Sequence, residues 1–156
     1  MPARSAGVVL FRRTPTGPEF LLVHPGGPFW AKRDDGAWSI PKGEYAADED
    51  AREVALRELE EEIGLAIAPG ELVPLTPVRQ RGGKVVSAWA AEAEWDPVNL
   101  RSNTFRLEWP PRSGKMAEFP EVDRAAWMTL EAARAKLNPA QLPLLEELAA
   151  TIAFHG

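Results

Sequence analysis

Three glutamates stand at a spacing that brings their carboxylates together on a helix: Glu58, Glu61 and Glu62. Residues three and four apart are neighbours on one helix face, so the three side chains form one acidic cluster. Like charges at this spacing destabilise a helix by roughly 0.2–0.5 kcal/mol per pair, and no lysine occurs between Lys42 and Lys84 to offset them. A hard divalent cation would make the cluster favourable, because Mg²⁺ prefers oxygen ligands and commonly bridges to substrate phosphates. The alternative interpretation is a solvated helix face.

The charge of the chain is concentrated around this cluster. Its 23 acidic and 18 basic residues give a formal net charge of −5. Residues 43–65 hold nine acids and two bases, a net of −7, whereas the rest of the chain is at +2. So weakly basic a body argues against nucleic acid as the partner, although hydrolysis of an RNA cap stays open. We expect the partner to be a small anionic molecule that shares a cation with the acidic segment.

The scarcity of cysteine and histidine excludes several kinds of metal site and catalytic nucleophile. The chain has no cysteine, which excludes thiolate zinc sites, iron–sulfur clusters, disulfides and cysteine nucleophiles. Its two histidines are His24, which we expect to be a surface or strand-end residue rather than a catalyst, and His155 near the end. Neither a phosphate-binding Gly-x4-Gly-Lys-Ser/Thr loop nor a Gly-x-Ser-x-Gly nucleophile elbow is present. Carboxylates remain as the metal ligands.

The glutamates need a helix that holds them against a core. Asp50 followed by Glu53 resembles a capping box, which predicts a helix from Ala51 to Ile63 that Gly64 would end. The face of this helix that we expect to pack on a sheet consists of four apolar residues: Ala55, Leu56, Leu59 and Ile63. The helix is therefore amphipathic, with an acidic face beside an apolar one.

Alternating and β-branched segments predict a sheet around that helix. Gly7–Arg13 and Phe20–Val23 read as a hairpin, and Gly82-Gly83 marks a second one between Leu72–Arg81 and Lys84–Ala93. Further expected strands are Ala37–Ile40, Phe105–Trp109 and Ala125–Met128, further helices are Leu130–Leu137 and Ala140–Ala153, and expected loops are His24–Gly36 and Trp109–Pro120. A chain of 156 residues is typical of one domain, 1–156, of α/β or α+β class. No apolar stretch approaches the length of a membrane span, and we expect a cytoplasmic location.

Residues 43–65, GEYAADEDAREVALRELEEEIGL, carry a family resemblance. They resemble the signature of the Nudix hydrolases, which runs Gly, five residues, Glu, seven residues, then Arg-Glu-apolar-any-Glu-Glu-any-Gly-apolar. Every fixed position is met, at Gly43, Glu49, Arg57, Glu58, Leu59, Glu61, Glu62, Gly64 and Leu65. The resemblance implies a Nudix-type α/β/α sandwich with a mixed sheet. It also implies one domain over the whole chain.

The resemblance assigns roles to these residues by position. It implies that Glu58, Glu61 and Glu62 bind metal and act in catalysis, with Glu61 or Glu58 as the base and Glu62 as the central ligand. The backbone carbonyl of Lys42 becomes a further candidate ligand. The positions that the resemblance marks as structural are Gly43, Glu49, Arg57 and Gly64, with Glu49 and Arg57 as an ion pair.

Residues outside the signature are candidates for completing the site. Family members often recruit one more carboxylate from a distant loop, and six residues before Trp127 this would be Glu121, with Glu118 as the alternative. A solvated loop acid is the competing interpretation of Glu121. Lys42 and Arg79 are our candidates for phosphate contacts. Six aromatic residues offer stacking faces, although core packing explains most of them: Trp30, Trp38, Trp89, Trp95, Phe105 and Trp109.

The expected reaction is hydrolysis of a diphosphate linkage in a nucleoside diphosphate derivative, with Mg²⁺ as cofactor and Mn²⁺ as the alternative. The segment WSIPKGEY, residues 38–45, resembles the Pro-Lys-Gly approach to the signature in dinucleoside-polyphosphate hydrolases. Those enzymes usually carry a tyrosine beyond the signature, whereas the only tyrosine here is Tyr45, so a nucleoside triphosphate of the MutT type stays open. A non-catalytic Nudix-fold module that senses a nucleotide is the competing function. The oligomeric state is open.

Overall fold

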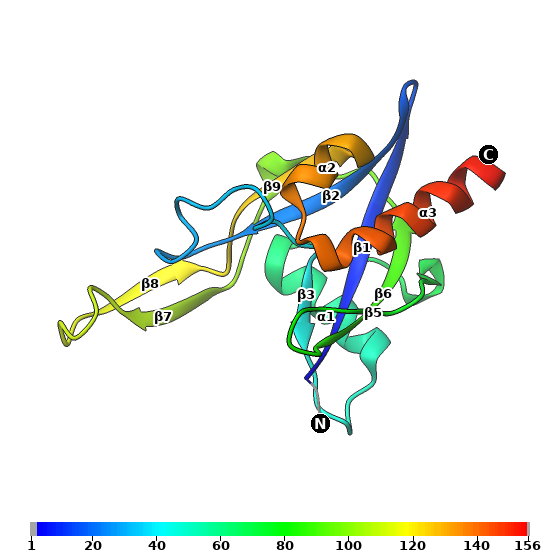
Figure 1. The fold of residues 1–156 in the computed structure, drawn as a ribbon. Coiled ribbons are helices and arrows are strands. Elements are labelled where there is room, and N and C mark those ends of the chain that lie inside the picture. Colours follow the sequence, from blue (N-terminus) through cyan, green and yellow to red (C-terminus); the bar gives the residue numbers. More distant parts are fainter. Residues whose placement is uncertain (1–2, 156) are drawn as a thin grey trace.

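The computed structural model describes residues 3–155, so residues 1, 2 and 156 of the expected domain lie outside the described residues. One mixed sheet forms the centre of the molecule (Figure 1). Its strands are β1 (Arg4–Thr14), β2 (Gly17–Pro25), β3 (Lys42–Glu44), β4 (Val73–Pro74), β5 (Val78–Arg79), β6 (Val85–Glu92) and β9 (Val122–Thr129). The order is β4-β6-β1-β2-β9, with β3 paired to β1 and β5 to β6. Strands β1 and β6 run parallel and the other pairs antiparallel.

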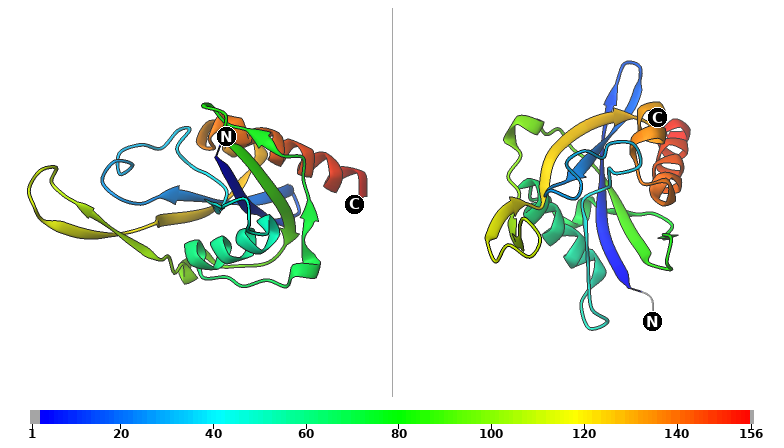
Figure 2. Two further views of the ribbon diagram at one scale, coloured as in Figure 1. Left: turned by 90° about the horizontal axis from the view of Figure 1, so that it is seen from below. Right: turned by 60° about the vertical axis from the view of Figure 1, so that its left-hand side comes forward.

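Helices cover both faces of this sheet, which gives three layers (Figures 1 and 2). The helices are α1 (Ala51–Ile63), α2 (Leu130–Lys136) and α3 (Leu142–His155), with short 3₁₀ turns at Pro69–Glu71, Pro97–Asn99 and Pro139–Gln141. Alternate residues of β1 supply the two cores: Val8 and Leu10 face α1, whereas Val9 and Phe11 face α2 and α3. Burial on both faces explains why the strand reads as a continuous apolar run. The α/β/α sandwich with a mixed sheet is confirmed.

Two expected strands differ from the structure, and proline interrupts the first of them. Leu72–Arg81 is split into β4 and β5, since Pro74 and Pro77 have no N–H to donate to a ladder. Ala37–Ile40 forms only isolated bridges, of Trp38 to Leu137 and of Ser39 to Val23. None of the helices among residues 3–155 has the length and apolar character that crossing a bilayer requires.

The expected loop Trp109–Pro120 was partly wrong, because its last five residues form a strand. This strand, β8 (Met116–Pro120), pairs antiparallel with β7 (Thr104–Glu108) in a separate two-stranded sheet. Phe105 lies opposite Phe119 in this pairing, and the arm so formed projects away from the main sheet (Figure 1). Half-buried Ala117 and Phe119 alternate with exposed residues in this segment, but Glu118 and Pro120 concealed the pattern in the sequence.

Candidate active site

Helix α1 is fixed at both ends, as its sequence predicts. The Asp50 carboxylate accepts the backbone N–H groups of Arg52 (2.9 Å) and Glu53 (3.3 Å), and satisfies donors that the helix itself cannot. Gly64 ends the helix in the left-handed region at φ 84° and donates its N–H to the Glu60 carbonyl at 2.8 Å. The buried face consists of Val54, Ala55, Leu59 and Ile63, so Val54 takes the place we expected for Leu56, which is half-buried.

The acidic face of α1 packs against β3 at Gly43. A Cβ atom on Gly43 would lie 2.1 Å from the carboxyl carbon of Glu58 and 2.4 Å from its Oε1. Any side chain at position 43 would therefore displace the Glu58 carboxylate. The absence of a side chain at Gly43 is what lets the glutamate lie against the strand backbone.

Strand β3 turns the backbone of Lys42 toward the helix. The bonds from Val8 N–H to Pro41 O (3.1 Å) and from Tyr45 N–H to Arg4 O (3.0 Å) define the hydrogen-bonded positions of the β1–β3 ladder. Lys42 falls between them, so its N–H and carbonyl both point away from β1. Its N–H group faces the Glu62 carboxylate and opposes the rise in the pKa of that group. The Lys42 carbonyl that the family resemblance proposes as a ligand thus points toward the side of β3 where that glutamate lies.

Burial and like charges perturb the glutamates that gather here. Burial, reinforced by the charge of Glu58, raises the pKa of Glu62 to about 8, and the positive charge of Lys42 opposes this rise. Burial and the charge of Glu61 likewise raise the pKa of Glu58. Burial, with Lys84 adding a smaller repulsion, lowers the pKa of Lys42. Burial therefore disfavours the charged forms of both the glutamates and the lysine at this place.

Arg57 connects the glutamates to the loop before α1. Its guanidinium is 3.2 Å from Glu49, and reaches Glu58 at 3.8 Å and Glu61 at 3.9 Å. Glu49 also accepts the backbone N–H of Ala46 at 2.9 Å. The contact with Ala46, followed by that with Arg57, lowers the pKa of Glu49. The predicted ion pair of Glu49 and Arg57 is present.

The structure also brings Glu121 to the cluster. Glu121 lies between β8 and β9, where its N–H donates to the Asn103 carbonyl at 2.8 Å and its carbonyl accepts the Gly26 N–H at 2.9 Å. Asn103 in turn donates its N–H to the Glu61 carbonyl at 2.7 Å, so backbone bonds join the Glu121 segment to α1. Burial and the charge of Glu61 raise the pKa of Glu121. A cavity of about 160 Å³ is lined by Val23, Pro25, Ser39, Ile40, Lys42, Glu62, Glu121 and Val122.

Two other residues that the sequence suggested for the site, Glu118 and Arg79, lie away from the glutamate cluster. Glu118 is exposed on β8, opposite Arg106. Arg79 is exposed on β5, where it donates to the Gly83 carbonyl at 3.3 Å. Strand β5 is three strand spacings from β3, roughly 14 Å at about 4.8 Å per strand. Arg79 is therefore not among the residues that the fold brings to the glutamates.

The donor set at this place suits a hard cation. Four carboxylates and the Lys42 carbonyl offer only oxygen, and a divalent cation would offset both the burial and the mutual repulsion that raise the pKa values of Glu58, Glu62 and Glu121. Among residues 3–155, no three acidic or histidine side chains converge tightly enough to hold an ion as they stand.

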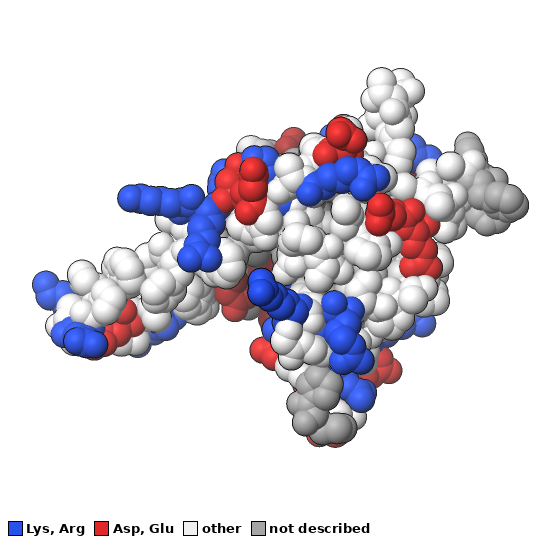
Figure 3. All heavy atoms as spheres, in the orientation of Figure 1, with Lys and Arg blue, Asp and Glu red and all other residues white. Residues whose placement is uncertain are grey.

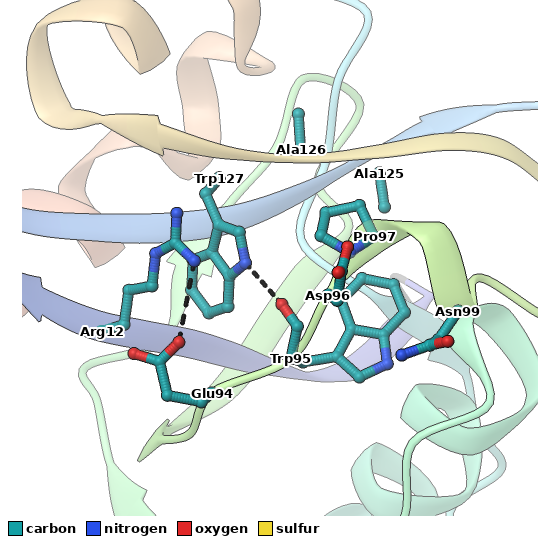
Figure 4. Close-up of a pocket in the computed structure, with 9 residues that line it drawn as sticks. All are labelled: Arg12, Glu94, Trp95, Asp96, Pro97, Asn99, Ala125, Ala126 and Trp127. Atoms are coloured by element: carbon teal, nitrogen blue, oxygen red, sulfur yellow. Dashed lines mark hydrogen bonds and ion pairs between the residues drawn. The ribbon is translucent and has the colours of Figure 1, made fainter.

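A larger hollow, of about 810 Å³, lies elsewhere on the sheet (Figure 4). The Arg12 guanidinium lies 4.6 Å from the ring centre of Trp127, which donates to the Trp95 carbonyl at 2.8 Å. Trp127 is five residues along β9 from Val122, which lines the smaller cavity, a separation of roughly 16 Å. This hollow is separate from the glutamates.

His24 differs from its expected environment. It does lie near the end of a strand, but its side chain is fully buried. One ring nitrogen lies 2.8 Å from Asp123 Oδ1 and the other 2.6 Å from the Arg33 carbonyl oxygen. The histidine thus fastens β9 to the loop between β2 and β3. The signal for burial was available, because His24 directly continues the apolar run Phe20–Val23.

Comparison with known proteins finds a family model, relatives in sequence and similar structures. The profile of the NUDIX domain family matches residues 1–148. An RNA pyrophosphohydrolase of Alkalilimnicola ehrlichii is 46% identical over 58 residues, 36% of this chain and only 32% of that protein. The asymmetrical bis(5'-nucleosyl)-tetraphosphatase of Rattus norvegicus is 32% identical over 139 residues, 78% of this chain and 89% of that protein. A C. elegans Ap4A hydrolase structure, a binary complex, superposes with a TM-score of 0.67 at 23% identity, over 96% of this chain and 98% of that one.

Proposed function

The chain belongs to the NUDIX domain family, and from this premise we propose that it is a hydrolase of phosphorus-containing anhydrides that depends on a divalent cation. Its substrate would be a nucleoside diphosphate derivative, cut at a diphosphate linkage. The observation that carries this proposal is the meeting of Glu62, Glu121 and Lys42 around one small cavity, with Glu58 and Glu61 beside it.

The residues of the site would have three roles: holding the cation, taking a proton from water and positioning the carboxylates. Glu58, Glu61, Glu62, Glu121 and the Lys42 carbonyl would hold Mg²⁺, or Mn²⁺ in its place. When bound, the cation supplies charge neutralisation at the phosphate oxygens and makes water more acidic. Glu61 or Glu58 would take the proton of the attacking water. Arg57 would keep these two carboxylates in place through its contacts at 3.8 and 3.9 Å.

Lys42 and Arg79 are the proposed phosphate contacts. Lys42 lines the cavity, and its ammonium group would meet the phosphate next to the scissile bond. Arg79 is roughly 14 Å away across the sheet. Only an extended polyphosphate would reach both residues.

A dinucleoside polyphosphate is the first substrate to test and a nucleoside triphosphate the second. The rat tetraphosphatase supports the first choice, because the similarity covers 89% of that protein. The similarity to the RNA pyrophosphohydrolase is confined to 58 residues, so it gives weaker support for RNA. We place the enzyme in the cytoplasm, acting on a small-molecule substrate.

The test is product release from both substrate classes in Mg²⁺, in Mn²⁺ and in EDTA. Glu62→Gln should lower kcat/KM at least about 100-fold, since it removes a buried ligand and charge, whereas Glu60→Gln on the exposed side of the same helix should have little effect. Tight binding of a nucleotide without hydrolysis by the native chain would instead support the sensing module. Equal loss in the two variants would contradict the assignment of the site.

A further inference from the structure

Two segments beside the small cavity at Glu62 and Glu121 pack against each other. They are the loop of residues 26–36 and the arm of β7 and β8, and we call them together the platform. The Phe29 ring meets the Trp109 ring edge to face, with centroids 5.4 Å apart. The Phe105 ring lies directly against Gly27, its Cζ 2.9 Å from where a Cβ atom of Gly27 would be. The loop and the arm lie side by side in both Figures 1 and 2.

This platform leaves large apolar side chains in solvent. Five large hydrophobic side chains are exposed among the described residues, and two of them, Phe29 (61% exposed) and Trp30 (39%), are neighbours in the loop of the platform. Exposure forfeits the favourable burial of these groups, and apolar surface that is gathered in one place marks an interaction site. Main-core packing, which we expected for most of the aromatics, does not hold for Trp30.

The loop that carries these aromatics is held rigidly. The Arg33 carbonyl is bonded to His24, Arg33 N–H donates to the Trp30 carbonyl at 2.9 Å, and Gly36 N–H donates to the Ala135 carbonyl at 3.0 Å. Asp34 accepts from the Trp38 indole at 2.8 Å and is paired with Lys136. An aromatic surface that is ordered before binding loses little entropy when a ligand stacks on it. The rigidity therefore favours a binding role over a merely unpacked loop.

Cations flank the aromatic surface. The platform carries five cations, Lys32, Arg33, Arg106, Arg112 and Lys115, against four acids, Asp34, Asp35, Glu108 and Glu118, and the cations next to the exposed rings are Lys32 and Arg33. The Arg33 guanidinium lies 5.6 Å from the Trp30 ring centre. Figure 3 shows basic side chains, with acidic ones beside them, over the loop and at the outer end of the arm, and uncharged surface between these two places. The combination of π faces and positive charge complements a nucleobase joined to phosphate.

The platform also lies within reach of the cleavage site. Gly26 N–H is bonded to the Glu121 carbonyl, and Phe29 follows three residues later, so the Gly26 and Phe29 backbones are separated by at most roughly 11 Å. We propose that Phe29 and Trp30 stack on the nucleobase at the far end of a dinucleoside polyphosphate whose phosphates lie at the glutamates. This inference rests on the proposed function and names a specificity-determining surface for it. The formal net charge of −5 favours this small ligand over RNA.

The test compares two substrates that differ only in the far nucleoside, a dinucleoside tetraphosphate and a nucleoside tetraphosphate. Phe29→Ala and Trp30→Ala should each raise KM for the first substrate about 5- to 100-fold. They should leave kcat unchanged and KM for the second within about twofold. Trp30→Phe, which keeps a stacking face, should restore most of the affinity. Val98→Ala is the matched control, because Val98 is an exposed apolar residue (82%) outside the platform.

Several results would overturn the inference. These are equal changes in KM for the two substrates, no change in either, or an effect confined to a 5'-triphosphorylated RNA oligonucleotide. Equilibrium binding of the dinucleoside tetraphosphate to the native chain and to Phe29→Ala gives a readout that needs no hydrolysis. Binding that weakens in Phe29→Ala without turnover in the native chain would reject the proposed hydrolase and retain the stacking surface. If Phe29→Ala and Trp30→Ala turn the dinucleoside tetraphosphate over as the native chain does, the proposed hydrolase stands and the stacking surface is rejected.

Discussion

Replacing Glu62 by glutamine should change how the stability of the metal-free chain depends on pH. Burial, together with the charge of Glu58, raises the pKa of Glu62 to about 8 from its ordinary value of 4.5. The folded chain therefore holds this proton more tightly than the unfolded chain does. The stability that the group contributes is complete below pH 4.5 and is lost as the pH rises toward 8. Glutamine stays neutral in both states and removes this dependence.

The size of the effect follows from the pKa values of Glu62 in the folded and unfolded chains. Every tenfold difference between the two proton affinities corresponds to about 1.36 kcal/mol. Integrated over the titration, the advantage of Glu62→Gln over the native chain should grow from about 1 kcal/mol at pH 5 to about 4 kcal/mol at pH 8. Rotation of the carboxyl toward water would reduce these figures, so a growth of about 2 kcal/mol over this range is the least that we expect.

Urea unfolding in EDTA at pH 5, 6, 7 and 8 measures this difference. Glu60→Gln is the matched control, because Glu60 is exposed on the same helix, and its curve should parallel that of the native chain. Added Mg²⁺ should stabilise the native chain more at pH 8 than at pH 6, since a proton must leave before a cation binds. Stabilities of Glu62→Gln and the native chain that stay parallel across the pH range would refute the reasoning.

Three further substitutions test how the site is assembled. Gly43→Ala places a Cβ atom 2.1 Å from the Glu58 carboxyl carbon, so kcat/KM should fall about 100-fold; unchanged kinetics would argue against a role for that carboxylate. Arg57→Ala should cost under about 1 kcal/mol of stability, because its ion pairs are exposed, yet lower kcat/KM by more than about tenfold. A melting temperature that falls in step with activity would mean that Arg57 is only structural. Asp123→Ala removes the partner of Nδ1 of buried His24, while the other ring nitrogen keeps the Arg33 carbonyl, and should destabilise the chain by about 1–3 kcal/mol in urea, with Asp123→Asn milder; equal losses would contradict this.

Local signals in the sequence predicted the acidic helix accurately. The Asp50 cap, the Gly64 stop and the 3.6-residue period of apolar positions all act within a few residues, so they are visible without the fold. The pairing of Glu49 with Arg57 was available because the signature fixes both positions. The helix and its charged face therefore needed no tertiary information.

The parts of the candidate site outside α1 depended on contacts between segments that are distant in the sequence. Glu121 was found through its distance from Trp127, but the backbone bonds that fix it involve Asn103 and Gly26, which no local pattern relates to it. The burial of His24 depends on Asp123, 99 residues away. Arg79 was proposed from a strand expected to face the glutamates, and its distance from β3 could be judged only once the pairing of β5 with β6, of β6 with β1 and of β1 with β3 was known.

The arm also separates two parts of the molecule that evolution can alter independently. Its two ends, Asn103 and Glu121, are hydrogen-bonded to each other at 2.8 Å, and Asn103 is bonded to the end of α1 at 2.7 Å. The chain therefore leaves the main fold at Asn103 and returns to it at Glu121, so the arm is a branch whose two ends are held together. Residues can be gained, lost or exchanged between these ends without moving the Glu121 backbone. If the arm contacts the ligand as proposed, ligand preference can diverge in such a branch while the proposed chemistry of the glutamates at its base is inherited unchanged.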